Sequence, residues 1–159
     1  MPRRRVPAEH RGFTRLRTRS ARKRGVLVRR LSEAAVTDVH RLKAHILMDA
    51  GELGSRNMSV NWLEVPAGAD EELRSHEESE QVYVVVKGTG VMTATGDAQA
   101  LSEGDLVMIP PATDHSVAND GEQPLALISV QSPAVSAEEL YSRRLAAQAA
   151  GFDEEYDED

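Results

Sequence analysis

Cysteine is absent from the 159 residues, and aromatic side chains make up only 4% of them. Without cysteine the chain can form neither disulfides nor zinc ribbons, and thiol chemistry is excluded. No apolar run approaches the roughly 18–20 residues of a membrane-spanning helix, and the first residues lack the apolar core of a secretory signal. These absences predict a cytoplasmic protein without a membrane span.

The composition fits one compact domain flanked by charged tails. With 40% hydrophobic residues the chain can build a core, but its net charge of −7 conceals a strong asymmetry. Residues 1–30 hold twelve Lys or Arg and one acid, whereas the other 129 residues hold seven bases and 25 acids. The last seven residues, DEEYDED, contain six acids. We therefore expect a basic, disordered arm over residues 1–30 and a solvated acidic tail over residues 151–159.

The basic arm is the feature that suggests nucleic acid, because clustered Lys and Arg bind phosphates by releasing counterions. Residues 1–30 have almost no aromatic or aliphatic pattern and no recognisable fold around them, which argues against that partner. Other interpretations stay open: docking of the arm on the acidic part of the chain, a native start near Gly25, and an Arg-rich transit peptide.

Between the tails, the sequence predicts an all-β domain over residues 31–135. Short apolar segments follow one another at close spacing, separated by turn sequences such as GTG, GDA and NDGEQP. This rhythm is typical of antiparallel sandwiches and barrels. The predicted strands are residues 41–49, 58–65, 81–87, 90–95, 99–102, 105–110, 115–120 and 125–131.

Two helical segments complete this expectation. Ser32 is placed to cap one or two helical turns ahead of the first strands. Ser136 and Glu139 have the spacing of a capping box, and apolar residues follow at helical spacing. We predict a C-terminal helix over residues 136–150, packed on the barrel.

The stretch GDLVMIPPATDHSVAN resembles the second conserved motif of the cupin superfamily. Gly104, Pro110, His115 and Asn119 stand where that motif has its Gly, Pro, His and Asn, and Ala112 replaces a usual glycine. The resemblance implies an antiparallel double-stranded β-helix, the jelly-roll barrel of cupins, with a metal or ligand inside its mouth. Such barrels are often homodimers.

The stretch RSHEESEQVYVVVKGTG resembles the first cupin motif, in which two histidines and an acid precede a glycine. Counting back from Gly88, His76 stands at the second histidine position and Gln81 at the position of the acid. The place of the first histidine is taken by Arg74. The resemblance to cupins covers roughly residues 58–131.

The resemblance implies a divalent transition metal (Fe, Ni, Zn, Mn or Cu) held by His76, Gln81 and His115. Imidazole nitrogens suit these ions, but the amide oxygen of Gln81 supplies no negative charge in place of the usual carboxylate. Strand alternation turns the nearby Glu80 to the face opposite Gln81. Tyr83 shares the face of Gln81, which makes it the candidate catalytic residue for proton transfer.

Arg74 is difficult to reconcile with a metal, because a guanidinium cannot act as a ligand and stays charged. At about 5 Å from a divalent ion it would be repelled by roughly 7 kcal/mol at an effective dielectric constant near 20. Arg74 therefore points outward, or the metal is absent. In the second case the guanidinium suits an anion pocket, gripping a ligand carboxylate or phosphate beside His76, Gln81, Tyr83 and His115.

Three functions follow from these residues and stay open. The first is a metal-dependent enzyme acting on a small polar molecule, of the dioxygenase, isomerase, lyase or cyclase type that the resemblance implies. The second is a metal-free binding or sensing protein that holds an anion through Arg74. The third is a scaffold whose barrel dimerises and whose arm contacts nucleic acid. A homodimer is expected because an incomplete barrel leaves strand edges to be covered, a task for which residues 41–49 are placed.

Overall fold

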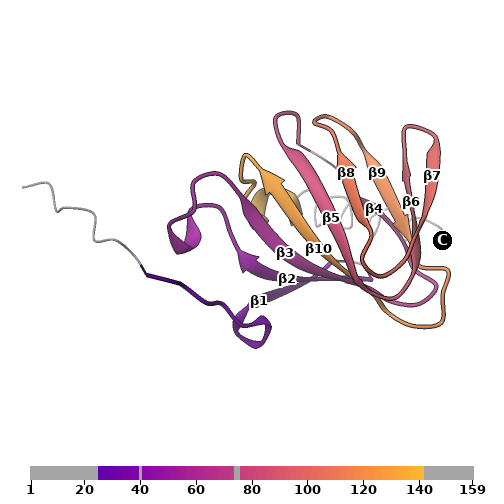
Figure 1. The fold of residues 1–159 in the computed structure, drawn as a ribbon, viewed down its shortest axis with the longest axis horizontal. Helices are drawn as coiled ribbons and strands as arrows, with labels where there is room; N and C mark the ends of the chain where they lie inside the picture. The colour runs from indigo at the N-terminus through magenta and orange to yellow at the C-terminus, as the bar shows by residue number, and fades with distance from the viewer. Residues whose placement is uncertain (1–24, 40, 74–75, 142–159) are drawn as a thin grey trace, which may run out of the picture.

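Two antiparallel β-sheets packed face to face make up the protein (Figure 1). The structure is a computed structural model and describes residues 25–39, 41–73 and 76–141. Every strand pairing among these residues is antiparallel. The predicted all-β antiparallel architecture is confirmed.

The larger sheet has six strands in the order β1-β2-β3-β10-β5-β8. Strand β2 lies between β1 and β3 of its own sheet, so the predicted strand over residues 41–49 extends the sheet of its own chain. The strands are β1 (Ala35–Val39), β2 (Leu42–Met48), β3 (Ser59–Val65), β10 (Leu125–Ser132), β5 (Glu80–Lys87) and β8 (Leu106–Ile109).

The smaller sheet has four strands in the order β4-β9-β6-β7 and faces the larger one (Figure 1). Its edge strand β7 and the edge strand β8 of the larger sheet come from one stretch of chain that crosses between the sheets after Leu101. The strands are β4 (Asp70–Leu73), β9 (His115–Ala118), β6 (Gly90–Ala94) and β7 (Asp97–Leu101).

The segment after Gly25 contradicts one prediction. Instead of helical turns capped by Ser32, Leu31–Glu33 forms a single 3-10 turn, and the chain then enters β1. The β-branched residues of β1 favour an extended backbone, and pairing with β2 gives it hydrogen-bond partners that an isolated helical turn would lack.

Strand β4 was not expected, because it lies in an acidic segment that resembles a break. Three of its four residues are acidic, so the sequence does not show the alternation of buried and exposed side chains. In the structure Glu71 and Leu73 are buried, whereas Asp70 and Glu72 are exposed.

Residues 137–141 are helical and begin where the C-terminal helix is predicted. The hydroxyl of Ser136 accepts a hydrogen bond from the backbone N–H of Glu139 at 3.1 Å, which is one half of the expected capping box. Tyr141 is buried in the main core cluster, and Leu140 packs against it.

Several predicted segments lie outside the described residues. They are the arm up to residue 24, the helix beyond residue 141 and the acidic tail. Among the described residues, none of the helical segments has the length and apolar character needed to cross a membrane.

The inward side chains of the larger sheet change from apolar to polar along its strands. Toward one end, Leu63, Leu127 and Val85 lie side by side on β3, β10 and β5 and are buried. Toward the other end, the same three strands bury two neighbouring rows of polar side chains. These rows are Asn61, Ser129 and Tyr83, and Ser59, Gln131 and Gln81.

The usual strand pattern is therefore reversed at this end of the sheet, because polar residues face the interior and apolar residues face out. Val60 and Trp62 on β3 and Ile128 and Val130 on β10 alternate with the buried polar residues and are only partly buried. Trp62 therefore lies on the outer face of the sheet.

Gly88 ends β5 in a turn that only glycine fits. Its φ is +85°, and a Cβ built there would lie 2.6 Å from the carbonyl oxygen of Pro124. Gly96, in the β6–β7 turn, has nearly the same φ of +83°, but nothing lies within 4 Å of a Cβ built there. Both positions therefore carry the strain of a left-handed backbone for any other residue, but only Gly88 also carries a steric overlap.

We predict that Gly96→Ala lowers the free energy of unfolding by about 1 kcal/mol, the cost of a left-handed alanine. Gly88→Ala carries the same backbone cost plus an overlap with a backbone carbonyl, worth a further ~1–3 kcal/mol. Chemical denaturation of both variants measures the difference. Equal losses would show that the chain at Pro124 moves away freely and that the close approach carries no constraint.

Candidate functional site

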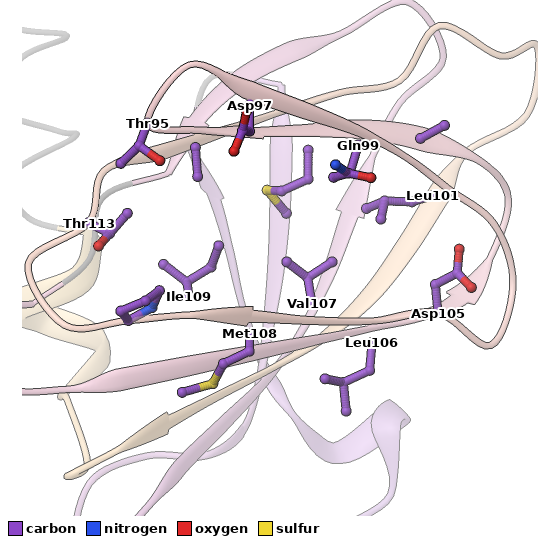
Figure 2. A pocket seen from close by; sticks show the side chains of 14 residues that line it. Thr95, Asp97, Gln99, Leu101, Asp105, Leu106, Val107, Met108, Ile109 and Thr113 are labelled. Carbon is purple, nitrogen blue, oxygen red and sulfur yellow. The ribbon is translucent and has the colours of Figure 1, made fainter.

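A cavity of about 550 Å³ opens between the two sheets at their free edges, β7 and β8 (Figure 2). Val107 and Ile109 point into it from β8, while Leu106 and Met108 point to the other side of that strand (Figure 2). Met92 and Leu101 extend this apolar wall, and the lining as a whole mixes apolar and polar groups. Polar side chains at the cavity are Thr95, Asp97, Gln99, Asp105 and Thr113.

The cavity abuts three of the residues that the sequence singles out. Gln81 lies directly across the ladder from Ile109, and Tyr83 from Val107. His115 is likewise the cross-strand partner of Ala94, which also lines the cavity. Opposed residues of an antiparallel pair share one face of the sheet, so the three polar residues stand beside the cavity wall inside the barrel.

The Tyr83 hydroxyl joins these residues into one network. Its oxygen lies 2.6 Å from Oε1 of Gln81 and 2.7 Å from Nε2 of His115. The rings of Tyr83 and His115 meet edge to face, with centroids 5.3 Å apart. Nδ1 of His115 lies 3.0 Å from the carbonyl oxygen of Thr113. Because Gln81 is 1% and His115 3% exposed, the network is shielded from bulk water.

The number of protons that His115, Tyr83 and Gln81 can donate limits how their hydrogen bonds are arranged. A carbonyl only accepts, so Nδ1 of His115 carries a proton toward Thr113. Tyr83 has one hydroxyl proton, which cannot serve both Gln81 Oε1 and an unprotonated Nε2 of His115. Either His115 is an imidazolium that donates to Tyr83, or the Gln81 amide is turned so that its NH₂ donates to Tyr83. The second arrangement also gives a partner to Nε2 of Gln81, which is buried without one.

His76 has a different partner. Its Nε2 lies 2.5 Å from Oε1 of Glu139, and the two side chains are 28% and 46% exposed. The backbone of His76 is tied to the second motif, because its carbonyl accepts a hydrogen bond from the N–H of Ala112 at 3.0 Å. The contact between His76 and Glu139 therefore links the C-terminal helical turn to the loop that precedes Gln81. Arg74 lies outside the described residues.

As arranged, the predicted donors do not fit a metal ion. Gln81 Oε1 and His115 Nε2 are both bonded to the Tyr83 hydroxyl, and His76 Nε2 is bonded to Glu139. Within residues 25–39, 41–73 and 76–141, no three His, Asp or Glu side chains come together as a metal site. The neighbouring acid Glu80 is exposed, as strand alternation predicts. A metal would have to replace the Tyr83 hydroxyl between its two partners.

Sequence reasoning missed a second set of buried polar residues beside Gln81. The Ser59 hydroxyl donates to Oε1 of Gln131 at 2.9 Å, and Nε2 of Gln131 donates to the Ser129 hydroxyl at 2.5 Å. Nδ2 of Asn61 donates to the Tyr141 hydroxyl at 3.3 Å. The available signal is spacing: on β3, β5 and β10 the polar residues repeat at i and i+2, so each pair shares one face.

The two polar rows enclose little free volume. A void of about 30 Å³ is lined by Gln81 and Tyr83 on one side and by Leu140 and Tyr141 of the helical turn on the other. That volume corresponds to roughly one water molecule. A ligand larger than water therefore fits the cavity beside β7 and β8 rather than this void.

Other residues of the second motif have structural roles. Nδ2 of Asn119 donates to the carbonyl oxygens of Val65 and Gln123, at 2.9 and 2.8 Å, and fixes the loop after β9. Ala112, which replaces a usual glycine, has a φ of +56°. The turn keeps the left-handed backbone that glycine would adopt without strain.

Comparison with known proteins gives a consistent assignment. The Cupin_2 model, a cupin domain, matches residues 61–131. An uncharacterised protein of Methanocaldococcus jannaschii is 35% identical over 75 residues, covering 47% of this chain and 60% of that protein. Mannose-1-phosphate guanylyltransferase of Escherichia coli is 33% identical over 85 residues, covering 54% of this chain. The matched segment is only 17% of that enzyme, so its activity as a whole is not carried over.

Solved structures share the fold. A predicted oxalate decarboxylase from Thermotoga maritima superposes with a TM-score of 0.62 at 20% identity, covering 67% of this chain and 99% of that one. An RmlC-like cupin from Shewanella frigidimarina gives a TM-score of 0.54 at 24% identity, covering 65% and 86%. The fold is that of a jelly-roll barrel, the predicted double-stranded β-helix. Residues 61–131 of the chain are a cupin domain.

We predict that Tyr83→Phe lowers the free energy of unfolding by about 2 kcal/mol, because it leaves buried polar atoms of Gln81 and His115 without their partner. Gln81→Met alone should also destabilise, since Tyr83 then loses a partner. In the double variant the hydroxyl and the amide are both gone, so the loss should be smaller than the sum of the two. Urea denaturation of the four proteins gives this coupling directly. Additive losses would contradict the network.

Proposed function

We propose that this cupin binds a small organic molecule in the cavity between β6, β7 and β8, without a resident metal. The observation that carries the proposal is the position of the cavity, whose inner wall adjoins the hydrogen-bonded network of Gln81, Tyr83 and His115. The hydrophobic wall would hold the apolar body of the ligand. The polar side chains at the cavity would orient its polar group.

The size of the cavity supports this proposal. At about 550 Å³ it lies within the range of roughly 300–1,000 Å³ that is typical of sites for small organic ligands. The smaller void beside Gln81 and Tyr83 is too small for such a molecule. The network therefore lies beside the ligand site, next to the lining residues Ala94, Val107 and Ile109.

The charges at the cavity favour a neutral or cationic ligand. Among the described residues, its lining includes Asp97 and Asp105 and no Lys or Arg. Asp105 is engaged by the backbone N–H of Ser102 at 2.8 Å, which leaves Asp97 as the carboxylate at the β6–β7 turn for contact with a ligand. An anionic ligand held by Arg74 remains the competing arrangement, and the names of the relatives give it concrete candidates in mannose 1-phosphate and oxalate.

A metal-dependent enzyme remains the second candidate, because cupins often bind a metal. The specific observation in its favour is that Gln81 and His115 point at one common atom, the Tyr83 hydroxyl oxygen. If the Tyr83 side chain moved away, Oε1 of Gln81 and Nε2 of His115 would be directed at a position where they could hold an ion. In such an enzyme Tyr83 would transfer protons through the hydrogen bonds of its hydroxyl with Gln81 and His115.

We predict that uncharged or cationic probes bind more tightly than matched anions. The probes are hexylamine against hexanoate, and mannose against mannose 1-phosphate, each titrated by calorimetry and by thermal shift. Repulsion by the acidic cavity should make the anion of each pair about tenfold weaker, or about 1.4 kcal/mol. Val107→Trp fills the cavity and should abolish binding, whereas Met108→Trp, on the next residue but the opposite face, should leave it unchanged.

Two results would contradict the proposal. Equal binding by the Val107→Trp and Met108→Trp variants would place the ligand elsewhere. Tighter binding of hexanoate or mannose 1-phosphate, lost in Arg74→Ala, would show that the site is an anion pocket.

A further inference from the structure

The turn between β6 and β7 contains a residue that its backbone conformation disfavours. Ala94 pairs with Asp97, so Thr95 and Gly96 form a two-residue hairpin loop, and their φ angles of +48° and +83° are both positive. Such a type I′ turn favours Asn, Asp or Gly at its first central position, because a β-branched side chain is crowded in the left-handed region. Thr95 is therefore strained in this turn.

The strained residue lines the cavity. Thr95 and Asp97 flank Gly96, and both side chains are part of the cavity lining (Figure 2). Within the described part of the chain, neither the Thr95 hydroxyl nor the Asp97 carboxylate has a hydrogen-bond or ion-pair partner. The hydroxyl thus makes no contact with the fold that would offset the strain. Residues strained in this way cluster at sites that bind ligands.

Thr113 adds a second hydroxyl to this end of the cavity. It lies two residues before His115, which pairs with Ala94 at the end of β6. Figure 2 shows Thr113 and Thr95 toward the same end of the cavity. The Thr113 hydroxyl donates its proton to the carbonyl oxygen of Pro111 at 3.2 Å, so toward a ligand it can only accept.

We propose that this end of the cavity binds the primary ammonium group of an alkylamine, with Thr95 as a residue that determines specificity. The inference rests on the ligand site proposed above and narrows its ligand to one chemical class. An ammonium group has three N–H donors. Three oxygens can accept them, one each from Asp97, Thr95 and Thr113. The apolar side chains of Val107 and Ile109 would hold the alkyl chain.

Other polar groups match these oxygens less well. A ligand hydroxyl has a single proton to donate, so it leaves two of the three oxygens to water. A quaternary ammonium carries the positive charge that suits Asp97 but has no N–H, so it loses all three hydrogen bonds. The number of N–H groups on the ligand nitrogen, in addition to its charge, should therefore determine the affinity.

NMR titration of the full chain with three amines at neutral pH tests this. Hexylamine, N,N-dimethylhexylamine and hexyltrimethylammonium share one alkyl chain and one charge but differ in the number of N–H groups. We expect affinity to fall in that order, with the quaternary ion about tenfold weaker than hexylamine. Equal affinities would overturn the proposal, because the site would then respond to charge alone. Binding of mannose without binding of hexylamine would overturn it too, but would leave the ligand site in place. Absence of binding by all of these probes would refute both.

Thr95→Val removes the hydroxyl but keeps the shape and the β-branching, so the backbone strain is unchanged. We expect this variant to bind hexylamine about fivefold more weakly and hexyltrimethylammonium as the wild type does. Thr95→Ser keeps the hydroxyl and should bind hexylamine as the wild type does.

The matched control is Thr93→Val, the same change on the face of β6 opposite the cavity-lining Met92 and Ala94. It should leave both affinities unchanged. An unchanged affinity of Thr95→Val for hexylamine would show that Thr95 is only a turn residue. An equal loss for both cations, or the same loss in Thr93→Val, would show that the change disturbs β6 rather than a hydrogen bond to the ligand.

Discussion

Strands β3, β5 and β10 must bury polar side chains inside the barrel at one end, and the rest of the molecule follows from that requirement. A strand has two faces, so each buried Asn61, Ser129 or Gln81 forces the residue beside it outward. Those neighbours are Val, Ile and Trp, apart from Glu80 at the start of β5. The interior thereby gains a set of hydrogen-bonding groups next to a cavity, and the exterior gains an apolar face. The polar interior beside the ligand site and the apolar outer face are two consequences of one alternation.

The polar rows are stable because almost every member has a partner. A buried hydroxyl or amide without a partner destabilises the fold by more than a single hydrogen bond stabilises it. Rows of buried polar side chains are therefore stable only when their members are hydrogen-bonded. Tyr83 is central to this, since its one hydroxyl contacts both Gln81 and His115. In the family pattern these two positions belong to metal ligands. Here a phenol oxygen on the same strand as Gln81 takes the central position, which explains how an amide can replace the usual carboxylate without leaving the imidazole unsatisfied.

Much of the fold could be predicted from the sequence, because its turns are marked by Gly, Pro, Asn and Asp. The strands from β5 to β10 lie where the turn sequences place them, and Gly88 has the left-handed backbone that its position after β5 requires. Strands β1 and β4 could not be predicted, since one resembles a capped helix and the other an acidic loop. Their structure comes from pairing with β2 and β9, which local sequence does not reveal.

For the site, the motifs correctly brought Gln81, Tyr83 and His115 together, but not the atoms that they contact. Two hydrogen bonds to one hydroxyl depend on side-chain rotamers, which a motif does not encode. The partner of His76 could not be foreseen either, because Glu139 belongs to a helical turn more than sixty residues away. The cavity is lined by β6 and β7 residues that lie outside both motifs and by residues of the second motif, such as Val107 and Ile109, to which the motif assigns no role.

The central claim is that the Tyr83 hydroxyl, not a metal ion, holds Gln81 and His115. The most direct measurement is a long-range ¹H–¹⁵N NMR spectrum of the five histidine rings in the full chain, recorded before and after addition of Zn²⁺ and of Mn²⁺. We expect a slowly exchanging Nδ1–H on His115 and a protected Tyr83 hydroxyl proton, both unchanged by either ion. Loss of the hydroxyl signal with a shift of the His115 Nε2 resonance on adding Zn²⁺, or broadening of His115 by Mn²⁺, would contradict the claim and restore the metal site.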